Sequence, residues 1–307
     1  MYTPQSCGFA CADHGRPLGG GRQELSGRNA LIPPSPWDRV RCHPTTRPAL
    51  TPVRAIEFFK GTLDATTEID AARVFDTTLR DGEQSPRTSF SYEDKREIAA
   101  ALDDMGTHVI EAGFPVNSDA EFEAVRDIAK STSATTCGLA RVVDKDVEAA
   151  LDAGVDMVHV FASTSDVQIE DSMHSTRADV KKRSVEAVER VAESGTTVMF
   201  SPMDATRTDE DYLIEMVEAV TEAGVDWINV PDTCGVATPA RFGALIEVID
   251  AHTTANIDVH THDDFGLATA NALMGIEAGA DQAQVSVNSI GERAGNAAYE
   301  EFVMAIE

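Results

Sequence analysis

The segments DAGVD (152–156), EAGVD (222–226) and EAGAD (277–281) are three copies of one short pattern. Each follows a longer amphipathic stretch and precedes a short run rich in apolar residues. A glycine at this place suits the left-handed residue that ends a helix. The pattern therefore predicts three junctions at which a helix ends and a strand begins.

The same alternation continues along the chain from residue 73. Candidate strands are Arg73–Thr78, Thr107–Ala112, Thr135–Ala140, Met157–Ser163, Thr196–Pro202, Trp227–Thr233, Ile257–Asp263 and Gln282–Asn288. Helix-like stretches between them include Tyr92–Met105, Asp119–Lys130, Ala178–Glu193, Glu210–Glu222 and Pro239–His252. Eight such βα units match the size of a TIM (β/α)8 barrel. We therefore predict an α/β fold with a TIM barrel over 73–307. A doubly wound open sheet is the alternative, but it would rarely need eight near-equal units.

Residues 1–54 have a different composition. They contain seven Arg, three acidic residues and eight of the 13 prolines, without a helical or strand period. We expect a disordered basic extension here, followed by a lead-in segment over 55–72. The extension lacks the continuous apolar core of a secretory signal. Only Cys137 and Cys234 fall in the predicted barrel, too few for a disulfide framework, so a reduced, cytoplasmic protein is expected.

The chain as a whole is strongly acidic. Its 25 Lys and Arg oppose 52 Asp and Glu, which gives a formal net charge of −27 at pH 7. Such a surface repels nucleic-acid phosphates and anionic lipids, so neither nucleic acid nor a membrane is an expected partner. The charge suits a salt-rich cytosol, in which screening weakens the self-repulsion, and it predicts a halophilic source.

Polar residues gather where three predicted strands end. The first strand runs into DTTLRDGEQ (76–84), the seventh ends in HTHDD (260–264), and the eighth leads to NSIGERAGN (288–296). His260 and His262 are two residues apart and lie on one face of a strand, so they can hold one ion together. Because active sites of such barrels lie at the C-terminal ends of the strands, these segments predict a mixed nitrogen and oxygen site for a divalent cation.

Four motifs carry a resemblance to a known family. FDTTLRDGEQSP (75–86), EAGFP (111–115), HTHDDFGLATANAL (260–273) and GERAGN (291–296) resemble the alpha-isopropylmalate synthase/homocitrate synthase family. The resemblance covers about 73–307 and is strongest to the 2-isopropylmalate synthase branch of leucine biosynthesis. It implies a metal-dependent transfer of the acetyl group of acetyl-CoA to a 2-oxo acid, with 2-oxoisovalerate the expected acceptor. Citramalate and homocitrate synthases, a hydroxymethylglutaryl-CoA lyase type of metal lyase, and a poorly active barrel that only binds metal and oxo acid are the alternatives.

The resemblance also implies roles for individual residues. The metal ligands, for Mg²⁺, Mn²⁺ or Zn²⁺, would be Asp81, His260, His262 and Asn296. Arg80 would stabilise negative charge on the substrate oxygen, or else form a structural salt bridge. Glu111 would either contact the substrate or pair with Arg80. Thr233 would contact the substrate or cap a turn, and Gln84 would orient Asp81 or the substrate.

Several features depart from the family pattern, and two of them bear directly on activity. In FSPMDATRTD (200–209), Met203 stands where most relatives have a Glu implicated in acid–base work, so the expected base is Asp204 or water. The chain also ends at Glu307 in the predicted eighth helix. Family members continue with subdomains that reach into the partner's active site. The resemblance therefore implies a homodimer, and a truncated chain that binds metal and 2-oxo acid but turns over slowly.

Overall fold

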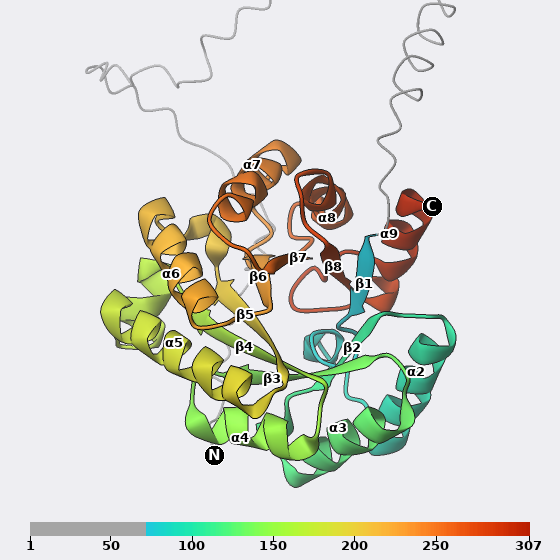
Figure 1. Ribbon diagram of the computed structural model, residues 1–307. Coiled ribbons are helices and arrows are strands. Elements are labelled where there is room, and N and C mark those ends of the chain that lie inside the picture. The colour runs from blue at the N-terminus through green and yellow to red at the C-terminus, as the bar shows by residue number, and fades with distance from the viewer. Residues whose placement is uncertain (1–71) are drawn as a thin grey trace, which may run out of the picture. The chain divides into compact units, whose positions relative to one another are not determined.

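The computed structural model describes residues 72–307. Within this part, eight parallel strands close into a barrel in chain order and helices surround it (Figure 1). The predicted TIM barrel is therefore confirmed. The expected extension over 1–54 lies outside the described residues, as does the lead-in segment except for its last residue.

The strands are β1 (Arg73–Asp76), β2 (Val109–Gly113), β3 (Thr135–Arg141), β4 (Met157–Ser163), β5 (Thr197–Met203), β6 (Trp227–Asp232), β7 (Asn256–Thr261) and β8 (Gln282–Val285). The α-helices are α2 (Tyr92–Asp104), α3 (Asp119–Ser131), α4 (Asp144–Ala153), α5 (Arg177–Ser194), α6 (Glu210–Glu222), α7 (Pro239–Asp250), α8 (Ala268–Glu277) and α9 (Tyr299–Ile306). Short helical turns are η2 (Gly82–Gln84), η3 (Pro115–Asn117), η4 (Gln168–Ser172), η5 (Ala205–Arg207) and η6 (Val287–Ser289).

The three repeated junctions are formed as the sequence predicts. Gly154, Gly224 and Gly279 have φ angles of 74°, 94° and 116°, which lie in the left-handed region that glycine adopts without a steric penalty. Each glycine follows the end of a helix and leads into the next strand. The local pattern therefore sets where α4, α6 and α8 end.

Strands β1, β7 and β8 end two or three residues earlier than predicted. After β1 the backbone turns back at once, because the N–H groups of Arg80 and Asp81 both donate to the carbonyl of Thr77. The polar motif that follows β1 is therefore a tight turn at the mouth of the barrel. This turn, and not the strand itself, carries the predicted site residues of that motif.

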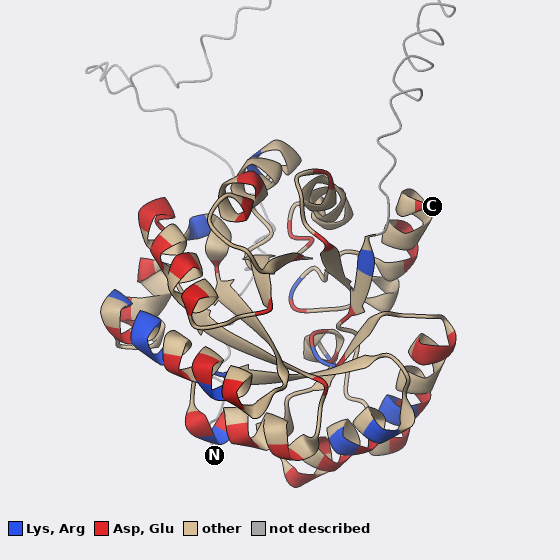
Figure 2. Ribbon diagram, in the orientation of Figure 1, with Lys and Arg blue, Asp and Glu red and all other residues tan. Residues whose placement is uncertain are grey.

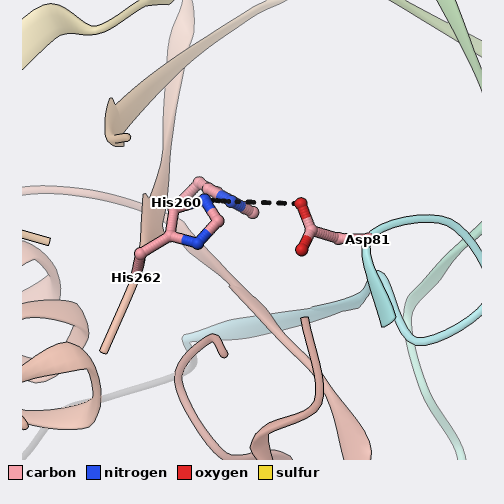
Figure 3. Close-up of side chains that lie close together, drawn as sticks. All are labelled: Asp81, His260 and His262. Atoms are coloured by element: carbon pink, nitrogen blue, oxygen red, sulfur yellow. Dashed lines mark hydrogen bonds and ion pairs between the residues drawn. The ribbon is translucent and has the colours of Figure 1, made fainter. Parts of the chain in front are cut away.

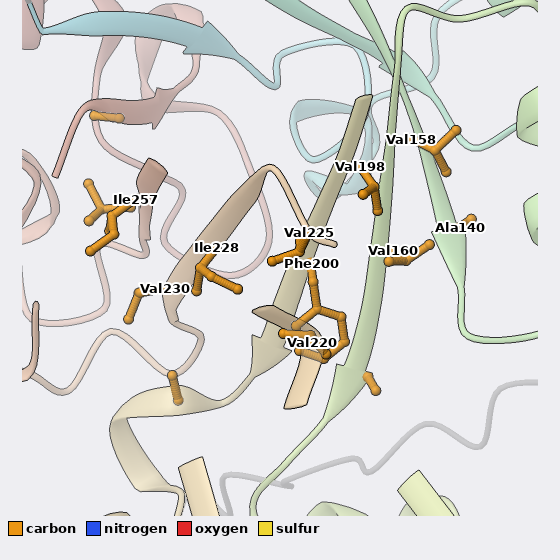
Figure 4. Packing of buried hydrophobic residues seen from close by; sticks show 14 of the residues in the cluster. Ala140, Val158, Val160, Val198, Phe200, Val220, Val225, Ile228, Val230 and Ile257 are labelled. Carbon is orange, nitrogen blue, oxygen red and sulfur yellow. The ribbon is translucent and has the colours of Figure 1, made fainter. Parts of the chain in front are cut away.

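Alternate residues of each strand point to opposite faces of the sheet, and the two faces pack into two different apolar cores. Those that face the helices belong to the larger core, part of which is shown in Figure 4, where Val158, Val160 and Phe200 lie on neighbouring strands. A smaller buried cluster fills the interior of the barrel: Phe75, Val109, Cys137, Met157, Met199 and Trp227. Two residues further along β2, β4 and β5, the inward positions are polar, and the site lies above them.

None of the helices in residues 72–307 is long and apolar enough to cross a membrane.

Candidate active site

A cavity of about 200 Å³ opens at the C-terminal ends of the strands. One part of its wall is apolar and includes Phe114, Leu139, Phe161, Met203 and Pro231. Other lining residues carry carboxylate, imidazole and guanidinium groups. Since drug-sized ligands occupy pockets of about 300–1,000 Å³, this cavity suits a smaller molecule with one apolar and one anionic end.

Three side chains of the kinds that bind metals, one aspartate and two histidines, converge at this cavity (Figure 3). Asp81 comes from the turn after β1, His260 from the end of β7, and His262 from the β-bridge just beyond it. The Nε2 atoms of His260 and His262 are 3.0 Å apart, and His260 Nε2 is 3.8 Å from Asp81 Oδ2. One ligand atom of each residue lies within 4.8 Å of the others, and all three residues are buried.

Asn296 is the fourth predicted ligand, and its contacts indicate whether the group fits a cation. Its Nδ2 donates to Asp81 Oδ1 at 3.0 Å, whereas its Oδ1 is buried without a hydrogen-bond partner among the described residues. A buried acceptor without a partner is costly, and a cation held by oxygen and nitrogen atoms would remove that cost. The group could therefore bind a metal.

The electrostatics of the group favour a cation as well. Burial lowers the pKa of His260 to about 3 and also lowers the pKa of His262, so both imidazoles are neutral at pH 7. Burial opposes ionisation of Asp81, but the positive charge of Arg80 holds the pKa of this carboxyl well below its usual range. Neutral imidazoles beside a carboxylate are the protonation states that metal binding requires.

Arg80 is held between two buried carboxylates. Its Nε donates to Glu111 Oε2 and its Nη1 to Asp81 Oδ2, each at 2.7 Å. Nη2 forms no hydrogen bond with any residue of the described part, and Arg80 lines the cavity. Glu111 does not line it, and also accepts a hydrogen bond from Thr77 Oγ1 at 2.5 Å. Of the two predicted roles of Glu111, the structure supports the pairing with Arg80.

Thr233 and Gln84 both line the cavity, as expected for residues that contact a substrate. The Thr233 hydroxyl also accepts a hydrogen bond from the backbone N–H of Asp204 at 2.8 Å. Thr233 therefore holds the turn after β5 as well as facing the cavity, so both of its predicted roles are compatible with its position. Gln84 is exposed at the rim.

Asp204 lies in a different environment from the one its predicted role requires. It has a φ of 72° and is buried, and its carboxylate accepts hydrogen bonds from Ser165 Oγ at 2.5 Å and from Arg207 Nη2 at 2.6 Å. Asp204 does not line the cavity, whereas the preceding Met203 does. The structure therefore gives no support to Asp204 as the base.

A chain of buried polar side chains, here called the polar belt, runs around the inside of the barrel, and most of its members line the cavity. Its members are Arg80, Glu111, His159, Ser201, Asn229, Asp258, Gln284 and His260. His159 Nε2 lies 2.6 Å from Ser201 Oγ, and Ser201 Oγ donates to Asn229 Oδ1 at 2.5 Å. Asn229 Nδ2 donates to Asp258 Oδ2 at 2.5 Å. Each neighbouring pair is hydrogen-bonded, so the belt ties the strands of the site together.

Four of these belt residues line the cavity but were absent from the sequence prediction: His159, Ser201, Asn229 and Gln284. A signal was available on β4, β5 and β6, because His159, Ser201 and Asn229 each lie two residues after an inward apolar residue of the same strand. On β8 both inward residues, Gln282 and Gln284, are polar. Each of these strands contributes a polar residue to the site, and these residues are recognised as one group only when the strands are placed side by side in the barrel.

Glu111, Cys137 and His159 form a second group of ligand-type atoms close together. The Glu111 carboxylate is already paired with Arg80 and lies 2.8 Å from His159 Nδ1. Burial raises the pKa of the Cys137 thiol well above its usual value, so no thiolate is available. A cation here would also meet the adjacent guanidinium, and we assign this group a structural role.

Curated relatives match most of this chain but only part of their own length. The probable 2-isopropylmalate synthase of Methanopyrus kandleri is 53% identical over 240 residues, which is 78% of this chain and 48% of the relative. The 2-isopropylmalate synthase of Methanocaldococcus jannaschii is 46% identical over 251 residues, 81% of this chain and 48% of the relative. The chain thus spans about half the length of these two relatives.

Solved structures show the same fold at low identity. The HMG-CoA lyase of Bacillus subtilis has a TM-score of 0.67 and 23% identity, over 77% of this chain and 85% of that one. The carboxyl transferase domain of Rhizobium etli pyruvate carboxylase has a TM-score of 0.62 and 21% identity, over 77% and 43%. These likenesses concern the barrel alone. The sequence of residues 71–307 matches the HMGL-like family, and the chain therefore belongs to that family.

Proposed function

We propose that this chain supports the metal-dependent condensation of acetyl-CoA with a 2-oxo acid, as a 2-isopropylmalate synthase of leucine biosynthesis. The observation that carries the proposal is the group of Asp81, His260, His262 and Asn296 beside Arg80 in one cavity. The identity of 46–53% to 2-isopropylmalate synthases over about four fifths of the chain supports the same activity.

Asp81, His260, His262 and Asn296 would hold the divalent ion, for which Mg²⁺, Mn²⁺ and Zn²⁺ are candidates. An ion bound there supplies Lewis-acid polarisation of a keto carbonyl. The residues of the chain hold the ligand atoms in place: the Asp81 carboxylate is fixed by Arg80 and Asn296, and His260 by Gln284. Such supporting contacts orient the ligands and strengthen binding.

Arg80 would bind the substrate and stabilise the negative charge that develops on its keto oxygen. Glu111 and Asp81 fix the guanidinium, so no reorganisation is needed when charge appears. Its Nη2 group remains available to a ligand, since Nε and Nη1 are occupied by these carboxylates. The guanidinium keeps its charge at any working pH.

The shape and charge of the cavity favour a short branched 2-oxo acid. Phe114, Leu139 and Phe161 offer an apolar wall to an isopropyl group. Arg80 is the only Lys or Arg among the described residues that line the cavity. A second carboxylate, as in 2-oxoglutarate, would therefore meet no further cation here, which argues for 2-oxoisovalerate over 2-oxoglutarate. Thr233 would contact the substrate from the end of β6.

No residue of the barrel is assigned to proton abstraction from the acetyl group. Met203 occupies the cavity wall, and a thioether cannot accept a proton. Asp204 is committed to Ser165 and Arg207. We propose a homodimer, as the family resemblance implies, in which a partner residue or water takes this role. Light scattering of the purified protein tests the dimer.

Release of free CoA tests the proposed reaction. The chain is incubated with acetyl-CoA and with 2-oxoisovalerate, pyruvate or 2-oxoglutarate, with and without a chelator. We expect thiol release to be fastest with 2-oxoisovalerate, to stop with chelator and to return when a divalent ion is restored. Cleavage of hydroxymethylglutaryl-CoA under the same conditions, without condensation, would instead identify a lyase.

A further inference from the structure

Gln284 is the polar-belt residue in direct contact with a proposed metal ligand. It lies opposite His260 in the register of β7 and β8, and its Oε1 is 2.8 Å from His260 Nδ1. Both residues are buried. We infer that Gln284, oriented by Asp258, fixes His260 in the tautomer with the proton on Nδ1 and so keeps its Nε2 lone pair free for a cation. The inference rests on the proposed metal site and makes Gln284 a positioning residue.

The orientation of the Gln284 amide follows from its other contacts. Its Nε2 donates to Asp258 Oδ2 at 2.7 Å and lies 3.7 Å from Met199 Sδ. Rotation of the amide by 180° would direct Oε1 at a carboxylate and a sulfur, which are both acceptors. Oε1 is therefore held toward His260.

Asp258 is itself fixed as the acceptor in this arrangement. Three amide groups donate to its carboxylate: Asn229 Nδ2 at 2.5 Å, Gln284 Nε2 at 2.7 Å and Gln282 Nε2 at 3.1 Å. All of these residues are buried, so water does not compete for the contacts. Asn229 Nδ2 and Gln284 Nε2 both lie against Oδ2, whereas Gln282 lies against Oδ1. Oδ2 is therefore the acceptor for Gln284 whether the carboxyl is ionised or carries a proton on Oδ1.

The consequence for His260 is a defined tautomer. A carbonyl oxygen at 2.8 Å accepts a hydrogen bond and cannot donate one, so Nδ1 carries the proton. In a neutral imidazole Nε2 is then unprotonated. This lone pair faces His262 Nε2 at 3.0 Å and Asp81 Oδ2 at 3.8 Å, which is where the proposed cation would lie.

Gln282 provides a matched control. It is also a buried glutamine of β8 and donates to the same Asp258 carboxylate, but it pairs with Asp258 in the strand register and makes no hydrogen bond to His260. Loss of either amide weakens the belt around Asp258. Only loss of Gln284 removes the acceptor that holds the His260 proton.

Nitrogen-15 NMR of the metal-free full chain tests the tautomer directly. Long-range ¹H–¹⁵N correlations distinguish Nδ1–H from Nε2–H imidazoles, and the His260 signals are assigned by their absence from the His260→Ala variant. We expect Nδ1–H in the wild-type chain and in Gln282→Met, and a shift toward Nε2–H in Gln284→Met. A wild-type His260 with the proton on Nε2 overturns the inference, and this result does not depend on the folding of either glutamine variant.

Titration with Co²⁺, followed by its visible absorption, tests the consequence for metal binding. Gln284→Met should weaken Co²⁺ binding about 10- to 100-fold, and Gln282→Met by no more than about 2-fold. Equal losses in the two variants would mean that the belt acts only through stability, and would overturn the inference. A wild-type chain that binds no Co²⁺ contradicts the proposed function, whereas the tautomer, measured without metal, still decides the inference.

Discussion

His260 and His262 offer their ring nitrogens to a cation because burial disfavours their protonated forms. We expect His260→Ala or His262→Ala to lower metal affinity at least about 10-fold and to abolish turnover. Calorimetric titration with Mn²⁺ measures the affinity. His252→Ala is the control, because His252 is an exposed histidine that pairs with Glu218 and does not line the cavity. Full metal content in His260→Ala would contradict the assigned site.

Arg80 differs from a lysine in its ability to bind two carboxylates and still present a third nitrogen. Arg80→Lys keeps the charge but loses this planar arrangement. We expect transition-state stabilisation to fall by about 2–4 kcal/mol, measured as a lower kcat/KM for CoA release. Arg177→Lys, at an exposed ion pair with Asp166, should leave kcat/KM unchanged. A near-normal rate in Arg80→Lys would indicate a purely structural arginine.

At the scale of elements, α8 approaches β7 closely because residue 275 is a glycine. A Cβ there would lie 2.9 Å from Val259 Cγ1 and 3.2 Å from Phe242 Cε1. Such crowding costs about 1–3 kcal/mol, which outweighs the gain in helix propensity of up to about 1 kcal/mol. We expect Gly275→Ala to lower the free energy of unfolding by about 1 kcal/mol in urea denaturation. Ala270→Ser, at an exposed position of the same helix, should change it by less than about 0.5 kcal/mol.

Val259 lies between Asp258 and His260 on β7, so crowding by residue 275 should also reach the site. Weaker Co²⁺ binding in Gly275→Ala, without a change in Ala270→Ser, would show that helix packing positions the metal ligands. A Gly275→Ala variant as stable as the wild type would mean that Val259 yields without cost.

The end of β1 carries a buried carboxyl that should make stability depend on pH. Burial raises the pKa of Asp76 from 3.8 to about 7, against the hydrogen bonds from Thr78. The folded state therefore binds this proton more tightly than the unfolded state. The stability that it contributes is fully present below about pH 3.8 and is lost as the pH rises through about 7.

Asp76→Asn removes this titration while keeping an oxygen for the Thr78 N–H. We expect the free energy of unfolding of the wild type, relative to Asp76→Asn, to fall between pH 4 and pH 8 by at most about 4 kcal/mol. Urea denaturation of both proteins across this range measures the difference. Parallel pH profiles would show that Asp76 keeps an ordinary pKa in the folded state.

At the scale of the whole molecule, acidic residues are spread along the outer helices (Figure 2). With a net charge of −27, mutual repulsion opposes the compact state and salt screens it. We expect the midpoint of thermal unfolding to rise between 0.1 and 2 M KCl. Sucrose at matched osmolality controls for the exclusion of solutes. An unfolding midpoint that is independent of salt would contradict the predicted halophilic adaptation.

The sequence alone predicted the barrel and the metal group. The glycine junctions and the alternation of helix and strand are local patterns, and Gly154 or Gly224 ends a helix by its own backbone preference. His260 and His262 are close in the chain, so their shared face follows from strand geometry. The segment after the first strand could be placed beside them because all parallel strands of a barrel end at the same mouth, whereas the choice of Asp81 and Asn296 as ligands came from the family resemblance.

Only the tertiary structure decided the partners of the individual side chains. It paired Glu111 with Arg80, committed the Asp204 carboxylate to Ser165 and Arg207, and joined Gln284 to His260. These contacts join groups from three to 39 positions apart, and most depend on which side chains of neighbouring strands and loops meet. No local sequence pattern specifies which of these side chains come into contact, because the contacts are set by strand register and by the backbone turns at the barrel mouth.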